Sequence, residues 1–324
     1  MTLGATRDAL IAALASMLAV AAISVIGASI GPTSGAAVSI VEPAGAPTRP
    51  ATDAGVLRGH TEPTTLPGGR RSVFGGGHFL VAYYGTAGTP ALGVLGDGSP
   101  AQVQRRLARA GSAFARKGHP VQLVYELIVS IADSSPGPDG DYSHDLTRAQ
   151  VEPYLRAAHR NDALLLLDIQ TGRSDFPTVA RRWRWALEDP WVGLALDPEW
   201  RMGGAEVPGR VIGHVDAAEV NRTAAWLSTL VEHRHLPQKL FVLHQFRTGM
   251  IRHVDRVRHR PGLVMVQHVD GFGTPTAKRA TFHAVARPQR FMLGFKLFYR
   301  ADVHRMSAAD VFRLRPRVRF VSFQ

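Results

Sequence analysis

The chain has 324 residues, 45% of them hydrophobic, and its 38 Lys and Arg outnumber 26 Asp and Glu to give a formal net charge of +12. This length and hydrophobic content suffice for one large packed domain with an appendage, and they exclude a globally disordered chain. Cysteine is absent, which excludes thiol nucleophiles, disulfides, thiolate metal sites and a lipid-modified cysteine.

The positive charge favours anionic partners, but its distribution argues against nucleic acid. The basic residues are scattered along the chain, with short groups at 105–106, 181–182 and 256–260. Neither an aromatic RNA-binding motif nor a zinc-finger spacing accompanies them. We therefore expect a basic, solvated surface and predict no nucleic-acid partner.

The N-terminal segment 1–30 is dominated by an apolar stretch that follows Arg7 and Asp8 and is interrupted only by small residues. Roughly 20 apolar residues are long for the core of a signal peptide and just enough to span a bilayer. Small residues at 27–29 and 35–37 suit a signal peptidase. We expect a signal peptide or a membrane anchor that engages the export machinery or the membrane. The protein is then secreted or membrane-anchored, outside the cytoplasm.

Residues 31–76 are rich in Pro, Gly, Thr and Ala and contain few large apolar side chains. Proline keeps such a segment extended and prevents a compact core. The composition predicts a disordered linker over 31–76 and a folded domain over 77–324.

The folded domain alternates short apolar runs with longer amphipathic stretches, which is typical of parallel strands joined by helices. Capping residues mark several of the helix starts, among them Ser99 before Pro100, and Ser307. The pattern predicts an α/β fold, a (β/α)₈ TIM barrel with eight parallel strands and seven intervening helices. The predicted strands are 79–84, 121–129, 163–170, 192–199, 240–246, 263–270, 292–298 and 318–323.

An open, doubly wound sheet is the alternative fold. It normally has fewer strands and often carries a glycine-rich dinucleotide fingerprint after its first strand. Residues 85–88 follow the first predicted strand as Gly-Thr-Ala-Gly, which lacks that fingerprint. The barrel is therefore favoured.

Polar residues gather at the C-terminal ends of the predicted strands, where the active sites of such barrels are built. Five acids, two histidines and one lysine are too many charges to bury in a barrel mouth unless they pair or serve a function. These residues are Glu126, Asp168, Asp197, Glu199, His244, His268, Asp270 and Lys296.

The fourth predicted strand carries two of these acids. Because side chains alternate along a strand, Asp197 and Glu199 are expected on the inward face, about 7 Å apart along the strand. Two neighbouring carboxyl groups raise the pKa of one and leave the other ionised, as acid catalysis with a carboxylate partner requires.

An Asp-x-Glu at the end of a fourth barrel strand resembles chitinase-like and bacterial-lysozyme-like glycosidases. In those families the Glu is the proton donor, and the Asp orients it or the substrate. The resemblance implies Glu199 as general acid and Asp197 as its helper. The chain departs from it at Ala195, where the chitinase-like group has a third acid. The C-terminal part is also similar to secreted bacterial proteins of unassigned function.

Further departures concern the later strands. Residues 267–270 read Gln-His-Val-Asp in place of the chitinase-like Tyr-Asp pair, and Lys296 stands where another group of retaining glycosidases has a nucleophilic Glu. Around the expected acids, a set of polar and aromatic residues is predicted to bind substrate. It comprises Tyr84, Arg173, Trp200, His244, Gln267, His268, Asp270 and Lys296.

The sequence thus predicts a hydrolase of the glycosidase kind that acts on cell-wall or environmental polysaccharide, including anionic glycans. Its catalytic carboxyl groups would be Glu199, Asp197, Asp168 and Glu126. One alternative is a non-catalytic carbohydrate- or cell-wall-binding barrel. The second is a metal-dependent hydrolase, because His244, His268 and Asp270 are able to bind a divalent ion with Glu126 or Asp168. We predict no bound metal or cofactor.

Overall fold

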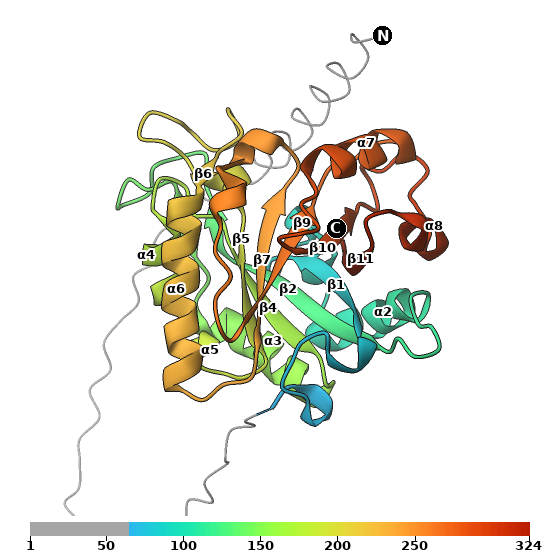
Figure 1. Ribbon diagram of the computed structural model, residues 1–324. Helices are drawn as coiled ribbons and strands as arrows, with labels where there is room; N and C mark the ends of the chain where they lie inside the picture. Colours follow the sequence, from blue (N-terminus) through green and yellow to red (C-terminus); the bar gives the residue numbers. More distant parts are fainter. Residues whose placement is uncertain (1–64) are drawn as a thin grey trace, which may run out of the picture.

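A computed structural model describes residues 65–324 (Figure 1). The predictions for the signal peptide or anchor at 1–30, and for most of the linker, lie outside the described residues. Within 65–324, no helix combines the length and the hydropathy needed to cross a membrane.

Eight parallel strands close into a barrel, with helices around it (Figure 1). The first strand pairs with both the last and the second, which closes the sheet. This confirms the predicted (β/α)₈ TIM barrel. The barrel strands are β1 (Phe79–Gly85), β2 (Val121–Ala132), β4 (Leu164–Ile169), β5 (Val192–Leu196), β7 (Lys239–Gln245), β9 (Leu263–Val269), β10 (Met292–Leu297) and β11 (Val318–Phe323).

Helices occupy the connections between these strands. The expected caps at Ser99 and Ser307 both accept backbone N–H groups of the first helical turn. Between β7 and β9 the chain forms the short β8 (Ile251–Arg252) and two 3₁₀ turns, at Thr248–Met250 and Val254–Arg256. The α-helices are α2 (Pro100–Ser112), α3 (Arg148–Arg160), α4 (Phe176–Arg182), α5 (Arg184–Leu187), α6 (Ala217–His233), α7 (Pro275–Val285) and α8 (Ala308–Arg313).

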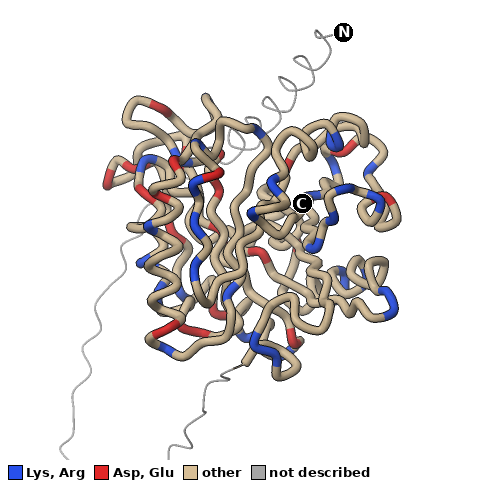
Figure 2. Tube along the Cα trace, viewed as in Figure 1, with Lys and Arg blue, Asp and Glu red and all other residues tan. Residues whose placement is uncertain are grey.

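Three short strands lie outside the barrel wall. β3 (Ser143–Asp145) pairs antiparallel with the end of β2, and β6 (Val215–Asp216) pairs with β8. Lys and Arg are spread over the helices and loops in Figure 2, in line with their scatter along the sequence.

The packed domain begins before Gly76, which corrects the predicted end of the linker. Leu66 and Val73 are buried and belong to the cluster inside the barrel. Trp191, which precedes β5, donates its indole N–H to the carbonyl of Thr65 at 2.8 Å. Gln238, which precedes β7, accepts from the Val73 N–H at 3.1 Å. Residues 65–76 therefore cover the N-terminal ends of the strands.

The barrel interior changes from apolar to polar along the strands. Its apolar part includes Ala82, Val124, Leu166, Ala195, Val242, Val266 and Phe320. Two residues further along each strand, the alternating pleat places the next inward side chain. Those next inward residues, together with Lys296 after Gly294, form a polar layer from all eight strands: Tyr84, Glu126, Asp168, Asp197, His244, His268, Lys296 and Ser322.

Candidate functional site

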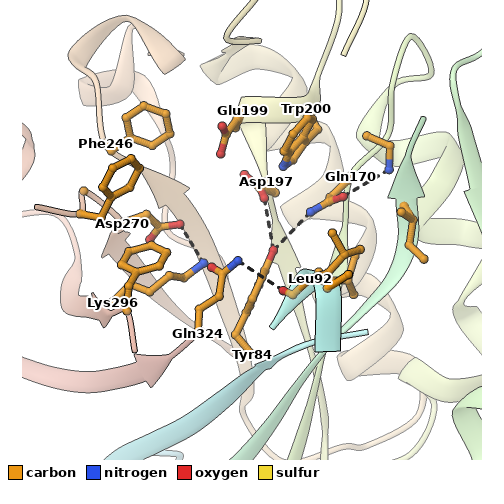
Figure 3. Close-up of a pocket in the computed structure, with 17 residues that line it drawn as sticks. Tyr84, Leu92, Gln170, Asp197, Glu199, Trp200, Phe246, Asp270, Lys296 and Gln324 are labelled. Carbon is orange, nitrogen blue, oxygen red and sulfur yellow. Dashed lines mark hydrogen bonds and ion pairs between the residues drawn. The ribbon is translucent and has the colours of Figure 1, made fainter. Parts of the chain in front are cut away.

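A pocket opens above this polar layer, at the C-terminal ends of the strands (Figure 3). Its empty volume, including the part open to solvent, is about 800 Å³. The pocket has a polar floor and an apolar wall, which is partly aromatic and partly aliphatic. Its lining includes Tyr84, Gln170, Asp197, Glu199, Trp200, Phe246, Asp270, Phe272, Lys296, Phe298 and Gln324.

Asp270, which follows β9, is the centre of an ionic network at one side of the floor. Its two oxygens accept from Nδ1 of His244 at 2.7 Å and Nδ1 of His268 at 2.8 Å. Lys296 Nζ lies 3.2 Å from Asp270 Oδ2. Burial favours the neutral carboxyl, but the charges of His244 and Lys296 outweigh it and hold the pKa of Asp270 well below its usual value. Asp270 is thus held ionised.

The two histidines differ in basicity although both contact Asp270. Burial opposes protonation of His244, yet the charge of Asp270 and the nearby Asp168 raise the pKa of His244 well above its usual value. For His268 burial prevails, and its pKa lies below the usual value. His268 Nε2 lies 3.3 Å from the hydroxyl of Ser322. His244 is therefore the more basic of the two.

Within the polar layer, His244 of β7 also faces two acids, one from β2 and one from β4. Its Nε2 lies 3.0 Å from Glu126 Oε1 and 3.1 Å from Asp168 Oδ2. All three side chains are fully buried. Burial works to raise the pKa of Glu126, but the His244 ring outweighs it and holds that pKa below its usual value.

Asp197 occupies the other side of the floor. Tyr84 donates its hydroxyl to Asp197 Oδ2 at 3.5 Å, and Gln170 donates to the same hydroxyl at 3.3 Å (Figure 3). Lys296 Nζ lies 3.6 Å from the centre of the Tyr84 ring, on its face. Burial, then the charge of Asp168, raises the pKa of Asp197 well above its usual value. Asp197 therefore keeps its proton to a higher pH than an ordinary carboxyl group does.

Glu199 reaches the same pocket by a different route from the expected one. The strand ends at Leu196, and Pro198 opens a 3₁₀ turn that includes Glu199 and Trp200. The spacing of about 7 Å for two residues of an extended strand therefore does not apply. Both acids nevertheless line the pocket, with Glu199 beside Trp200 at its upper part (Figure 3).

A second buried ion pair supports the aromatic part of the wall. Lys278 of α7 lies 3.0 Å from Asp302. The carboxylate of Asp302 accepts from the backbone N–H of Gly273 at 3.2 Å and of Phe298 at 2.9 Å. These bonds join the segments that carry Phe272 and Phe298.

The structure brings together ten of the twelve predicted site residues. Tyr84, Asp197, Glu199, Trp200, Asp270 and Lys296 line the pocket, and Glu126, Asp168, His244 and His268 lie in the polar layer without lining the pocket.

Arg173 and Gln267 of the predicted substrate-binding set do not line the pocket. Arg173 donates to the carbonyl of Glu206 at 3.0 Å and stacks on Tyr142, rather than lying beside Asp168. Gln267 precedes the inward His268, so the pleat points it away from the barrel interior. Its side chain bonds Gln245 and the backbone of Val285 and Arg287.

The predicted set missed Gln170, Ser322 and the aromatic residues Phe246, Phe272 and Phe298. Ser322 occupies the inward position of β11 that corresponds to Lys296 in β10, with which it is in register. The three phenylalanines each lie within three residues of the end of a strand. This position just after a strand end is the one signal in the sequence that could have placed the three phenylalanines at the pocket.

The ring of His268 requires a glycine opposite it. Gly294 is its register partner in β10, and a Cβ at this position would lie 2.3 Å from His268 Cδ2. We expect Gly294→Ala to lower the free energy of unfolding by about 1–3 kcal/mol, because the buried ring has to shift. Urea unfolding measures this. Gly204→Ala, which adds a methyl in open space, is the control, and an equal loss in both variants would contradict the argument.

Comparison of the sequence with family models and with curated proteins gave no match. The functional proposal therefore depends on the barrel and on the geometry at its C-terminal face.

Proposed function

We propose that this protein is a glycoside hydrolase of the carboxylate acid/base kind, which acts outside the cytoplasm on cell-wall or environmental polysaccharide. The observation that carries the proposal is the meeting of Asp197 and Glu199 in one pocket with a partly aromatic wall. Glycosidic cleavage requires two carboxyl groups beside the bond, one of them protonated and the other ionised.

The environment of each acid assigns its role in this proposal. Asp197 is buried and its pKa is raised well above the usual value, so we assign it as the general acid that protonates the leaving oxygen. Glu199 is more exposed and acts as the carboxylate that activates water or stabilises the developing positive charge of the sugar. These roles are the reverse of those that the resemblance implied.

The wall and the floor supply binding and electrostatics. Trp200, Phe246 and Phe298 offer aromatic faces to the apolar side of a sugar ring. Lys296 and Asp270 offer a cation and an anion for its hydroxyl groups, at the side of the floor away from Asp197 (Figure 3).

The proposal is tested with the purified full-length chain on a panel of soluble polysaccharides, cell-wall glycans and aryl glycosides, with release of reducing ends as the readout. We expect turnover by the wild type and none by the double variant Asp197→Asn/Glu199→Gln. The control is Asp133→Asn, since Asp133 follows β2 and pairs with the exposed His144.

Three other outcomes would contradict hydrolysis by these acids. Glycan binding without turnover would indicate the non-catalytic, carbohydrate-binding alternative. Turnover that is lost with a chelator but kept in the double variant would indicate a metal-dependent hydrolase. The absence of both binding and turnover on the whole panel would exclude the assigned substrate class.

A further inference from the structure

Five buried polar atoms converge in the polar layer, on three residues that do not line the pocket. They are both carboxylate oxygens of Glu126, both of Asp168, and Nε2 of His244. The three side chains are fully buried, and within residues 65–324 none of the five atoms makes a hydrogen bond. His244 Nε2 is close to both acids, but the angle at its ring N–H is not that of a hydrogen bond to either carboxylate oxygen. Such atoms are costly unless a further group satisfies them.

The spacing of these atoms suits a metal ion. His244 Nε2 lies 3.0 Å from Glu126 Oε1 and 3.1 Å from Asp168 Oδ2, and one donor atom from each residue lies within 4.8 Å of the others. Ligands in tetrahedral bonds of 2.0–2.1 Å to one ion are roughly 3.3 Å apart. One imidazole and two carboxylates form a donor set of the kind that zinc and related first-row ions take, unlike the all-oxygen set of calcium.

A metal-binding histidine usually donates the N–H of its other ring nitrogen to a carboxylate or a carbonyl group, and Asp270 is that acceptor for His244. Asp270 accepts from His244 Nδ1 at 2.7 Å, which fixes the ring and leaves Nε2 without a hydrogen bond, 3.0 Å from Glu126 and 3.1 Å from Asp168. The neighbouring group of His244, His268 and Asp270 is a poorer candidate, because the two Nδ1 atoms already bond to Asp270.

The charges of the cluster can also accommodate a divalent cation. Glu126, Asp168 and Asp270, when ionised, carry three negative charges, against one positive charge on Lys296. A divalent ion bound to neutral His244 would balance the remaining two. The ring centre of Tyr84, which lines the pocket, lies 5.8 Å from that of His244. Against the absence of metal expected from the sequence, we propose that Glu126, Asp168 and His244 bind a divalent metal ion of the zinc type in the polar layer that the pocket opens above.

The ion would hold three strands together at the C-terminal face of the barrel: β2, β4 and β7. Its three ligands do not line the pocket, whereas Asp197 and Glu199 do. Its presence is therefore independent of glycan hydrolysis, and it is measured without an activity assay.

The test uses the full-length chain, purified without a histidine tag, stripped with chelator and titrated with Zn²⁺ alone by calorimetry. We expect about one Zn²⁺ per chain, confirmed by elemental analysis, and a rise in the midpoint of thermal unfolding. Glu126→Gln and Asp168→Asn should each weaken the affinity on the order of 100-fold or more, since loss of a supporting residue alone costs 10–100-fold. Asp270→Asn changes only the residue that supports His244, so it should weaken the Zn²⁺ affinity by about 10–100-fold.

The control is His253→Gln, which removes an exposed histidine that pairs with Asp216 and should leave Zn²⁺ binding unchanged. The proposal is overturned if the stripped wild-type protein binds no Zn²⁺ with one-to-one stoichiometry. It is equally overturned if the folded Glu126→Gln and Asp168→Asn variants bind as tightly as the wild type. Circular dichroism reports folding, and the wild-type stoichiometry decides the question if a variant does not fold.

Discussion

Asp197→Asn is expected to lower kcat on a polysaccharide substrate by about 10²–10⁴-fold, because the amide cannot donate the proton that the leaving oxygen needs. An aryl glycoside whose leaving group needs no protonation should lose much less. In the wild type, activity should fall as pH rises through the pKa of Asp197, which burial and the charge of Asp168 raise well above the ordinary value. The variant should lack this dependence.

These two readouts separate acid catalysis from a structural role. A merely misfolded pocket would lower the activity on both kinds of substrate equally and would leave the shape of the pH profile unchanged. Asp133→Asn again serves as the control, because it removes a strand-end acid that pairs with an exposed histidine. An equal loss on both substrates would remove Asp197 from the role of general acid.

The barrel was predictable because its strands are buried on both sides, so that each is a short apolar run that local sequence reveals. Most of the predicted strand boundaries lie within one or two residues of the observed ones. The exceptions are informative. β2 continues to Ala132 because its end pairs with β3, and β5 stops at Leu196 because Pro198 opens a 3₁₀ turn.

The N-terminal boundary was not predictable from composition. Residues 65–76 are rich in Gly and Arg, and they include only three large apolar side chains. Two of these, Leu66 and Val73, are buried within the barrel. Whether such a segment packs depends on the space left at the N-terminal ends of the strands, which local sequence does not describe.

The candidate site was predictable where the two-residue repeat of a strand continues to its end. Glu126, Asp168, His244 and Lys296 follow apolar or small inward residues by two positions, so their convergence follows from the barrel. The same rule excludes Gln267, which alternates with the inward His268. Arg173 lies in a loop, and the path of a loop depends on contacts such as that with Glu206, which no periodicity gives.

Lys296→Met is expected to lower the free energy of unfolding by about 3–5 kcal/mol, because it removes one partner of a buried ion pair and keeps a side chain of similar length. Lys296 is 3% exposed, and its Nζ lies 3.2 Å from Asp270 and over the ring of Tyr84. Burial disfavours its charge, but Asp270 and Glu126 outweigh burial and raise the pKa of Lys296 above its usual value. Equilibrium unfolding in urea measures the loss.

The matched control is Arg313→Met, which removes a cation from the exposed pair with Asp310 and should cost less than about 1 kcal/mol. The double variant Lys296→Met/Asp270→Asn tests the pairing itself. If Lys296 is needed to balance Asp270, the two losses should not add, since the second substitution removes the charge that the first left uncompensated. Full additivity, or a Lys296→Met loss no larger than that of the control, would mean that the histidines balance Asp270 alone. Lys296 would then be available to bind an anionic group of the substrate.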